Sequence, residues 1–409
     1  MWIRVIVAAA ALGLVNLALA AGVQSPELPA PFATPSAAKR SKVVGWPADG
    51  APRPLQNFRV SAFARGLKEP RWLLVLPNGD VLVAESAAGR VTLLRDPHHE
   101  GKALEQTKLI DGLNRPFGLA LRRDRLYIGD TDAVLACPFL VGQNAIRGSC
   151  KTVMDLPDGA INGHWTRNVI FSPDESLMYV SVGSSTNIDE EGIDAKEPHR
   201  AAILSASPDG KNVQIYASGL RNPVGLAFEP ETGRLWTTVN ERDGLGDNLP
   251  PDYMTAVKQG GFYGWPYSYY GGHEDPRMAG RRPDLVARAL TPDYTFDPHA
   301  ATLGLVFYQR DAFPKQYRGG AFVAEHGSWN RATFAGYKVV SVPFAHGKPA
   351  GPPEDFLTGF IKDEASSEVY GRPVGLAVAS DGALLVADDG GGVVWRVTYK
   401  CSACTPDPR

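Results

Sequence analysis

The 409-residue chain has no excess of charge of either sign, because its 42 Lys and Arg residues are matched by 44 Asp and Glu residues. It therefore lacks the basic composition that attracts nucleic acid or an anionic membrane surface. Beyond the N-terminus it also lacks any second apolar run long enough to span a bilayer. We therefore expect a mature chain that is soluble, with no nucleic-acid partner and no membrane span.

Residues 1–20 have the pattern of a secretory signal peptide. Arg4 precedes an almost unbroken apolar stretch over residues 5–19, and residues 18–20 (Ala-Leu-Ala) match a small-x-small cleavage site. An N-terminal membrane anchor is the alternative, but the stretch is short and contains Asn16. We predict cleavage and a periplasmic or secreted protein. Residues 21–56, rich in Ala, Pro and Ser, are predicted to be a linker or a loosely packed arm.

Cysteine is scarce, with four residues in the whole chain. Cys137 and Cys150 flank a turn-rich stretch, and export would permit a disulfide across this hairpin. Cys401 and Cys404 form a C-x-x-C in the C-terminal tail (401–409), without the following His of a haem attachment site. A disulfide in the tail is favoured over a redox pair, and no second Cys or His pair has the spacing of a zinc site.

The positive signal in the sequence is repetition. Each of six units has a polar dipeptide near a Pro, an apolar strand, a turn and a second apolar strand. The equivalent anchor positions are Pro70, Pro116, Thr166, Pro223, Thr302 and Pro373. The 43 Gly and 33 Pro residues are consistent with short strands joined by turns. We predict an all-β fold, a six-bladed β-propeller of four-stranded antiparallel blades over residues 57–400.

A propeller must close its ring, and the sequence offers a strand for this purpose. Residues 58–63 alternate like a strand and precede the first unit. We expect them to form the outer strand of the last blade, next to residues 393–397.

Polar residues recur where the first strand of each unit begins and where the second ends. In a propeller these positions meet around one mouth. The entry positions are Arg71, Arg115, His164, Arg221, Asn222, His299 and Arg372. The exit positions are Glu85, Asp130, Asn187, Glu241, Asp243, Glu325, His326, Asp388 and Asp389, with Arg242 and Arg331 nearby.

This combination of charges indicates a ligand site. Several arginines suit an anion with more than one carboxylate or phosphate, because guanidinium binds such groups bidentately. The acids could hold a hard cation through oxygen. The alternative is that the charges form salt bridges between blades around a solvated rim. His164 is a candidate general base, because an unperturbed imidazole titrates near pH ~6.5.

Three motifs together resemble one known family. They are His164-Trp165-x-Arg167-Asn168, Arg221-Asn222-Pro223-x-Gly225-Leu226-Ala227-Phe228 and Gly260-Gly261-Phe262-Tyr263-Gly264-Trp265-Pro266. In combination they look like the soluble quinoprotein glucose/sorbosone dehydrogenases, and the resemblance runs over residues 57–400. The stretches 324–331 and 371–375 are more similar to the sorbosone dehydrogenase branch.

The resemblance implies a six-bladed propeller that binds pyrroloquinoline quinone and Ca²⁺. His164 would be the base that takes a proton from the substrate hydroxyl while hydride passes to the quinone, and Arg221 would polarise the quinone carbonyl. Asn222 and Arg372 would contact the cofactor. Arg115, His326 and Arg331 are further candidates for cofactor binding. Glu241, Asp243 and Asp247 are candidates for calcium, in a loop that departs from the pattern of the glucose enzymes.

The first hypothesis is a periplasmic quinoprotein dehydrogenase for a sugar or a related aldehyde or alcohol. Its electrons would leave to a separate acceptor, because the chain has no haem motif. The second is a calcium-dependent lactonase or esterase using Glu85, Asn187, Asn240 and Asp388, which leaves the arginines unexplained. The third is a non-catalytic binding propeller.

An aromatic cluster follows the third motif. Tyr263, Trp265, Tyr267, Tyr269 and Tyr270 could stack on a sugar or pack between blades. Packing between blades is the commoner use of such a cluster.

Overall fold

The computed structural model describes residues 26–159 and 163–400. The predicted signal peptide and the pair Cys401 and Cys404 lie outside the described residues. Within the described part of the chain, no helix has the length and apolar character needed to cross a membrane.

Six sheets of four or five strands contain most of the strands of the described chain. The first is β4 (Pro70–Val75), β5 (Val81–Glu85), β6 (Arg90–Arg95) and β7 (Glu105–Ile110). The second is β8 (Leu119–Arg122), β9 (Arg125–Gly129), β10 (Ala133–Pro138) and β11 (Lys151–Asp155). The third is β12 (Val169–Phe171), β13 (Met178–Val182), β14 (Ala202–Ala206) and β15 (Gln214–Ser218), to which β19 (Gly261–Phe262) adds in parallel.

The other three large sheets follow in chain order. The fourth is β16 (Asn222–Phe228), β17 (Leu235–Asn240), β18 (Pro251–Ala256) and β22 (Tyr294–Pro298). The fifth is β23 (Thr302–Phe307), β24 (Ala321–Glu325), β25 (Lys338–Val342) and β28 (Glu354–Thr358), with β2 (Arg53–Pro54) at its edge. The sixth is β31 (Pro373–Val378), β32 (Leu384–Asp388), β33 (Val393–Tyr399) and β3 (Phe58–Arg65).

Shorter elements decorate these sheets. They are β1 (Lys42–Val43), β20 (Ser268–Tyr269), β21 (His273–Glu274), β26 (Phe344–Ala345), β27 (Lys348–Pro349), β29 (Ile361–Asp363), β30 (Glu368–Val369), the helix α1 (Pro283–Arg288) and the 3₁₀ turns η1 (Ser86–Ala88), η2 (Asp194–Lys196) and η3 (Lys315–Tyr317).

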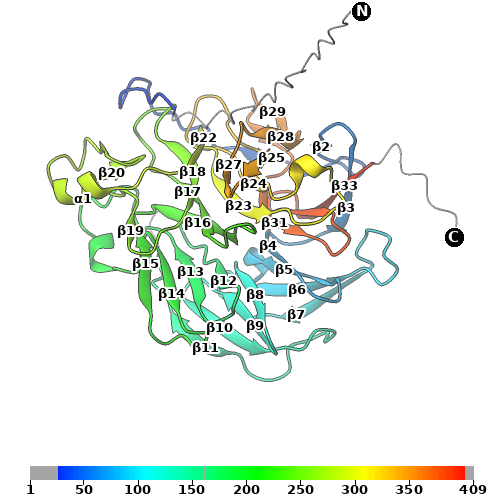
Figure 1. Cartoon of the computed structure of the whole chain (residues 1–409). Helices are drawn as coiled ribbons and strands as arrows, with labels where there is room; N and C mark the ends of the chain where they lie inside the picture. The colour runs from blue at the N-terminus through cyan, green and yellow to red at the C-terminus, as the bar shows by residue number, and fades with distance from the viewer. Residues whose placement is uncertain (1–25, 160–162, 401–409) are drawn as a thin grey trace, which may run out of the picture.

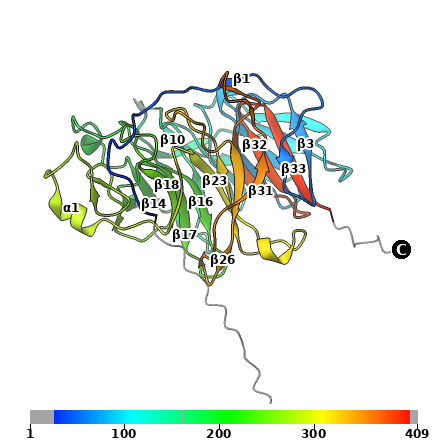
Figure 2. The ribbon, with the colours of Figure 1, turned by 90° about the horizontal axis from the view of Figure 1, so that it is seen from above.

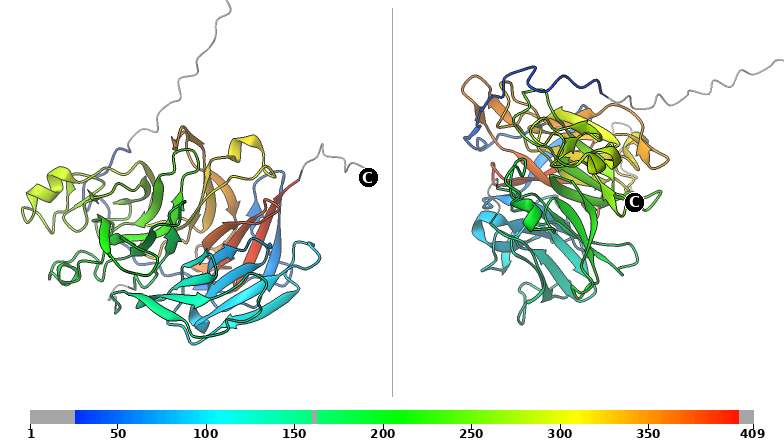
Figure 3. Two further views of the ribbon diagram at one scale, coloured as in Figure 1. Left: turned by 60° about the horizontal axis from the view of Figure 1, so that its bottom comes forward. Right: turned by 90° about the vertical axis from the view of Figure 1, so that its left-hand side faces the viewer.

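The first strands of the large sheets form a ring. β4 contacts β8, β8 contacts β12, β12 contacts β16, β16 contacts β23, β23 contacts β31, and β31 returns to β4. In Figure 1 these six strands surround one centre, and the tilted view of Figure 3 shows the outer strands radiating from it. The all-β propeller architecture expected from the repeats is confirmed.

The repeated glycine of the first strands has a steric cause. Neighbouring first strands approach so closely that a Cβ at Gly304 would meet the carbonyl oxygen of Val374. A Cβ at Gly375 would meet the carbonyl oxygen of Arg71 in the next sheet. Glycine therefore lets the inner strands of adjacent sheets touch.

Two predicted links between distant residues are confirmed. β3 pairs antiparallel with β33, with Phe58 opposite Tyr399 and Arg65 opposite Val393, so an N-terminal strand completes the last sheet. Cys137 at the end of β10 forms a disulfide with Cys150 just before β11.

The segment interpreted as a linker or loosely packed arm is instead bound to the ring over its described part. β1 pairs in parallel with β30, and β2 extends the fifth sheet. Trp46 packs against Trp395, and its indole N–H donates a hydrogen bond to Asp388. Figure 2 shows the dark blue segment running from the side of α1 to β1. We call residues 26–55 the N-terminal strap.

Candidate active site

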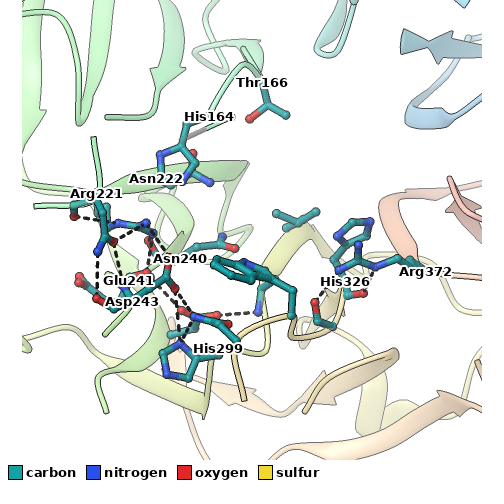
Figure 4. Close-up of a pocket in the computed structure, with 18 of the residues that line it drawn as sticks. His164, Thr166, Arg221, Asn222, Asn240, Glu241, Asp243, His299, His326 and Arg372 are labelled. Atoms are coloured by element: carbon teal, nitrogen blue, oxygen red, sulfur yellow. Dashed lines mark hydrogen bonds and ion pairs between the residues drawn. The ribbon is translucent and has the colours of Figure 1, made fainter. Parts of the chain in front are cut away.

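A cavity of about 750 Å³ lies where the first strands begin. This volume is within the ~300–1,000 Å³ typical of small-molecule sites. The charged and polar side chains that line it are Arg40, Ser41, Arg71, His164, Thr166, Asn187, Arg221, Asn222, Asn240, Glu241, Asp243, Asp252, His299, His326, Asn330 and Arg372. Figure 4 shows His164, Arg221 and Asp243 on one side and His326 and Arg372 on the other. Most of the entry and exit positions predicted from the repeats therefore line one cavity.

His164 precedes β12 and faces the cavity. Its Nδ1 lies 3.1 Å from the carbonyl oxygen and 3.2 Å from Oγ of Ser184. A carbonyl can only accept, so we assign the proton to Nδ1 and leave Nε2 as the basic nitrogen. Burial, with Arg221 nearby, lowers the pKa of His164 well below its usual value. The ring is therefore neutral at pH 7.

Arg221 is almost fully buried and held at several points. Its guanidinium donates to the backbone oxygen of Glu241 at 2.5 Å and to Asn187 Oδ1 at 2.9 Å. It also pairs with Asp243 at 3.3 Å. Burial alone would raise the pKa of Asp243, but Arg221 and His299 outweigh it and keep the pKa below its usual value. Arg221 is therefore a fixed positive charge beside His164.

His299 and Asn330 extend this network. Asn330 donates to Asp243 and lies 3.0 Å from His299 Nδ1, while His299 Nε2 lies 3.0 Å from the backbone oxygen of Gly246. Burial alone would lower the pKa of His299, but the carboxylate of Asp243 at 3.7 Å and the hydrogen bond with Gly246 outweigh burial, and the pKa is raised overall. His299 was visible as an entry position, whereas Asn330 lies in the stretch 324–331 and was assigned no role from the sequence.

The opposite side of the cavity carries a second charged group. His326 Nε2 lies 2.9 Å from Asp389, which also pairs with Arg71. Burial, with Arg372 nearby, lowers the pKa of His326 to about 4. Arg372 donates to the backbone oxygens of His326 at 3.0 Å and Gly327 at 2.6 Å. Among residues 26–159 and 163–400 no carboxylate pairs with Arg372, so its charge is available to a ligand.

Besides the hydroxyl of Thr166, two buried side-chain oxygen atoms in the cavity wall have no hydrogen-bond partner within the described chain. They are Asn222 Oδ1 and Glu241 Oε1. Burial raises the pKa of Glu241 to about 7. Buried polar atoms are normally satisfied, so these two oxygens call for a donor or a cation from outside the chain.

The predicted calcium carboxylates are not gathered into one site. Asp247 lies outside the cavity lining and accepts hydrogen bonds from the backbone N–H groups of Ala37 at 3.1 Å and Ala332 at 2.7 Å. Asp243 is occupied by Arg221 and Asn330. Over the described ranges no group of three or more His, Cys, Asp or Glu side chains has the arrangement of a metal site.

Two predicted cofactor residues also lie outside the cavity lining. Arg115 stacks on the ring of Trp165 at 3.8 Å. Arg331 donates to Asn248 at 3.1 Å in an exposed position. The repeats place both residues near the mouth, but the side chains make contacts outside the cavity.

Several exit-position acids serve the backbone. Glu85, Asp130 and Asp388 accept hydrogen bonds from the backbone N–H groups of Lys68 at 2.5 Å, Asn114 at 2.9 Å and Arg372 at 2.7 Å, respectively. Each bond joins the end of a second strand to the entry loop of the same sheet. Glu85 and Asp388 do not line the cavity, so the four residues of the lactonase hypothesis are not brought together.

The aromatic cluster is used for packing. Tyr263, Trp265, Tyr269 and Tyr270 are buried outside the cavity lining. Trp265 donates to the backbone oxygen of Asn187 at 2.9 Å. Three lining residues that the sequence did not reveal are Arg40, Ser41 and Trp329.

A closed ring of sheets with a polar cavity at the start of its inner strands defines the chain as a propeller with a small-molecule site. The chain belongs to the TrAA12-like family, whose model matches residues 52–259 and 285–400. This match confirms the kinship with quinone-dependent sugar dehydrogenases that the three motifs suggested.

Three relatives illustrate the comparison. An uncharacterized protein of Borreliella burgdorferi is 29% identical over 361 residues, covering 84% of this chain and 90% of the relative. A pyrroloquinoline quinone-dependent pyranose dehydrogenase of Coprinopsis cinerea is 25% identical, covering 85% of this chain and 55% of the relative. A calcium structure of a Trichoderma reesei carbohydrate-active enzyme of family AA12 superposes with a TM-score of 0.73 at 21% identity, covering 88% and 98%. The last likeness shows a shared fold.

Proposed function

We propose that the chain is a six-bladed, periplasmic or secreted quinoprotein dehydrogenase. It oxidises a sugar or a sugar-derived aldehyde or alcohol by hydride transfer to pyrroloquinoline quinone, with His164 as general base and a separate electron acceptor. The observation that carries this proposal is the partly buried, neutral His164 beside the fixed guanidinium of Arg221. The names of the quinone-dependent relatives support it.

The residues of the cavity fit a flat tricarboxylate cofactor. Arg372 is a partly buried cation without an acid partner in the described chain, and Asn222 Oδ1 is a buried acceptor without a donor there. Arg372, Asn222 and Arg221 would hold the quinone, since guanidinium groups match carboxylates and polarise carbonyls. When bound, the quinone supplies the two-electron acceptor for hydride.

The proposal includes Ca²⁺, and one carboxylate oxygen in the cavity supports it. Glu241 Oε1 is the lining carboxylate oxygen without a hydrogen-bond partner in the described chain. Ca²⁺ takes about six to eight oxygen ligands, so backbone oxygens, waters and the cofactor would supply the rest. The relative crystallised with calcium supports this assignment.

The chain's own residues carry the proton chemistry. His164 Nε2 accepts the proton of the substrate hydroxyl, and its lowered pKa keeps the imidazole in the form that can accept it. Arg221 cannot turn away, because Asn187, Glu241 and Asp243 hold it, and it stabilises negative charge that develops in the cavity.

The test loads the protein with pyrroloquinoline quinone and Ca²⁺ and measures dye-coupled turnover on aldoses and aldosones. We expect micromolar or tighter quinone binding, and a loss of turnover of about 10²- to 10⁴-fold in His164→Gln with quinone affinity retained. His346→Gln, at a 95% exposed histidine, is the matched control. Lost quinone binding with normal activity per bound cofactor would remove His164 from the role of base. Turnover of lactones without quinone would overturn the whole proposal.

A further inference from the structure

We propose that Arg40 and Trp329 form a subsite at the rim of the cavity that binds the carboxylate of an acidic sugar. This inference rests on the proposed function and names a substrate class for it. Both residues line the cavity, and neither was assigned a role from the sequence.

Trp329 is the aromatic half of the subsite. Its side chain is 41% exposed, and of the large exposed hydrophobic residues in the described chain it is the one that lines the cavity. An exposed indole at a cavity rim exposes apolar area to water. An indole face covers the C–H face of a sugar ring well, so a bound sugar would remove this area from water.

Arg40 is the charged half. Its guanidinium stacks on the Trp329 ring at 5.0 Å, and no hydrogen bond or ion pair engages it within residues 26–159 and 163–400. The deeper Arg71 and Arg221 differ, because Asp389 and Asp243 pair with them. An arginine with free donors beside an aromatic platform matches a carboxylate bidentately.

The strap holds the two residues in one place. Lys39 N–H donates to the backbone oxygen of Trp329 at 2.7 Å, directly before Arg40. On one side Ala37 N–H donates to Asp247, and on the other β1 pairs with β30. The subsite is therefore ordered before the ligand arrives, which lowers the entropic cost of binding.

A carboxylate in the cavity could come from the sugar or from the quinone. The position of Arg40 favours the sugar. Arg40 is exposed on the strap, whereas at the strand entries Arg221 is buried and Arg372 is partly buried. The polar chemistry proposed for the cofactor is supplied by those strand-entry residues, so the rim arginine is left for the outer ligand.

The first experiment compares D-glucuronate with D-glucose, and D-galacturonate with D-galactose, on the loaded enzyme. We expect Arg40→Gln to raise KM for the uronates about 10-fold and KM for the neutral sugars less than 2-fold. Trp329→Ala should raise both. Arg123→Gln, at a 73% exposed arginine of the β8–β9 turn, should change neither.

The second experiment measures binding without turnover. Saturation-transfer NMR of D-glucuronate with the cofactor-free protein should show a signal that Arg40→Gln removes, and quinone affinity should be equal in wild type and Arg40→Gln. A 10-fold loss of quinone affinity with an unchanged uronate-to-glucose ratio would overturn the subsite in favour of a cofactor contact. If sugars are oxidised but KM for the uronates is unchanged in Arg40→Gln, the subsite proposal is wrong and the proposed function stands. If uronate binding depends on Arg40 but no sugar is oxidised, the proposed function fails and the subsite stands.

Discussion

Ionisable side chains at the mouth fall into two groups, those that the chain pairs with an opposite charge and those that it does not. Asp389 is enclosed by His326 and Arg71, and Arg221 is enclosed by Asp243 and backbone oxygens. Within residues 26–159 and 163–400, Arg372 contacts backbone oxygens and the Tyr337 ring, Arg40 contacts the Trp329 ring, and neither has a carboxylate partner. The first kind keeps the walls in place, and the second kind is available to bind a ligand.

His326 should make the cofactor-free protein acid-sensitive. Burial lowers its pKa to about 4, below the ~6.5 of an unfolded chain, so the unfolded state binds more protons between these values. The contribution of His326 to the free energy of unfolding is therefore fully present above pH ~6.5 and is lost as the pH drops toward 4. Arg71, Arg372 and Asp389 surround the ring and set this balance.

Urea unfolding of the cofactor-free protein across pH 4–8 checks the effect. His326→Gln should flatten the slope in this window by up to about 1 kcal/mol per pH unit. His346→Gln, at an exposed ring, should leave the slope as it is. Equal slopes for wild type and both variants would show that His326 does not titrate in this window.

The sequence predicted which residues reach the mouth better than how they are used there. His164, Arg221, Asn222 and Arg372 recur at equivalent points of a repeat, and a propeller brings such points together. The repeat does not determine whether a backbone N–H already satisfies an acid, as for Glu85 and Asp388. It also cannot place Arg40, which reaches the cavity from outside the repeats.

At the level of elements, the β10–β11 hairpin is the one that carries a disulfide within residues 26–159 and 163–400. The disulfide joins cysteines 13 positions apart and closes a loop that carries the exposed Leu140 and Val141. Such a loop is worth about 3 kcal/mol of unfolding free energy in the chain-entropy estimate. We expect the Cys137→Ser/Cys150→Ser variant to lose about 2–3 kcal/mol of unfolding free energy, measured by urea unfolding.

Reduction of the wild-type protein provides the matched control for the disulfide. Dithiothreitol opens the loop without changing a side chain, so it separates loop closure from the loss of the buried Cys137. Both samples should unfold at lower urea than the oxidised protein. An unchanged midpoint in both would show that the hairpin holds its loop by packing alone.

The strap shows where composition is a poor guide to an element. A stretch rich in Ala, Pro and Ser has no apolar period, so the sequence indicated a linker. Its attachment uses backbone hydrogen bonds, as between Lys39 and Trp329, and single anchors such as Trp46. Neither leaves a pattern in the sequence. The closing strand β3 was predictable, because it alternates like the strands that it joins.

For the whole molecule, β3 and the strap should contribute in different ways. A chain that begins at residue 57 loses the strap but keeps the β3–β33 pair, and we expect it to unfold cooperatively at a reduced Tm. A chain that begins at residue 67 lacks β3, so the outer edge of β33 is unpaired while its inner edge stays paired with β32. We expect it to lose cooperative unfolding and to aggregate, because an exposed strand edge pairs with other chains.

Circular dichroism melts and light scattering check this pair of truncations. The chain from residue 57 serves as the control, since it lacks every residue of the strap that the shorter chain lacks. A cooperative, monomeric chain from residue 67 would show that the other five sheets are stable without closure.

The pairing of β3 with β33 joins residues from the two ends of the described chain. During synthesis β3 leaves the ribosome long before its partner β33 exists. The last sheet therefore cannot be completed until residue 399 has been made. A nascent chain therefore remains an open arc throughout translation. Its folding is timed by the completion of the polypeptide, so any translocation machinery that receives the chain before that moment meets an unclosed protein.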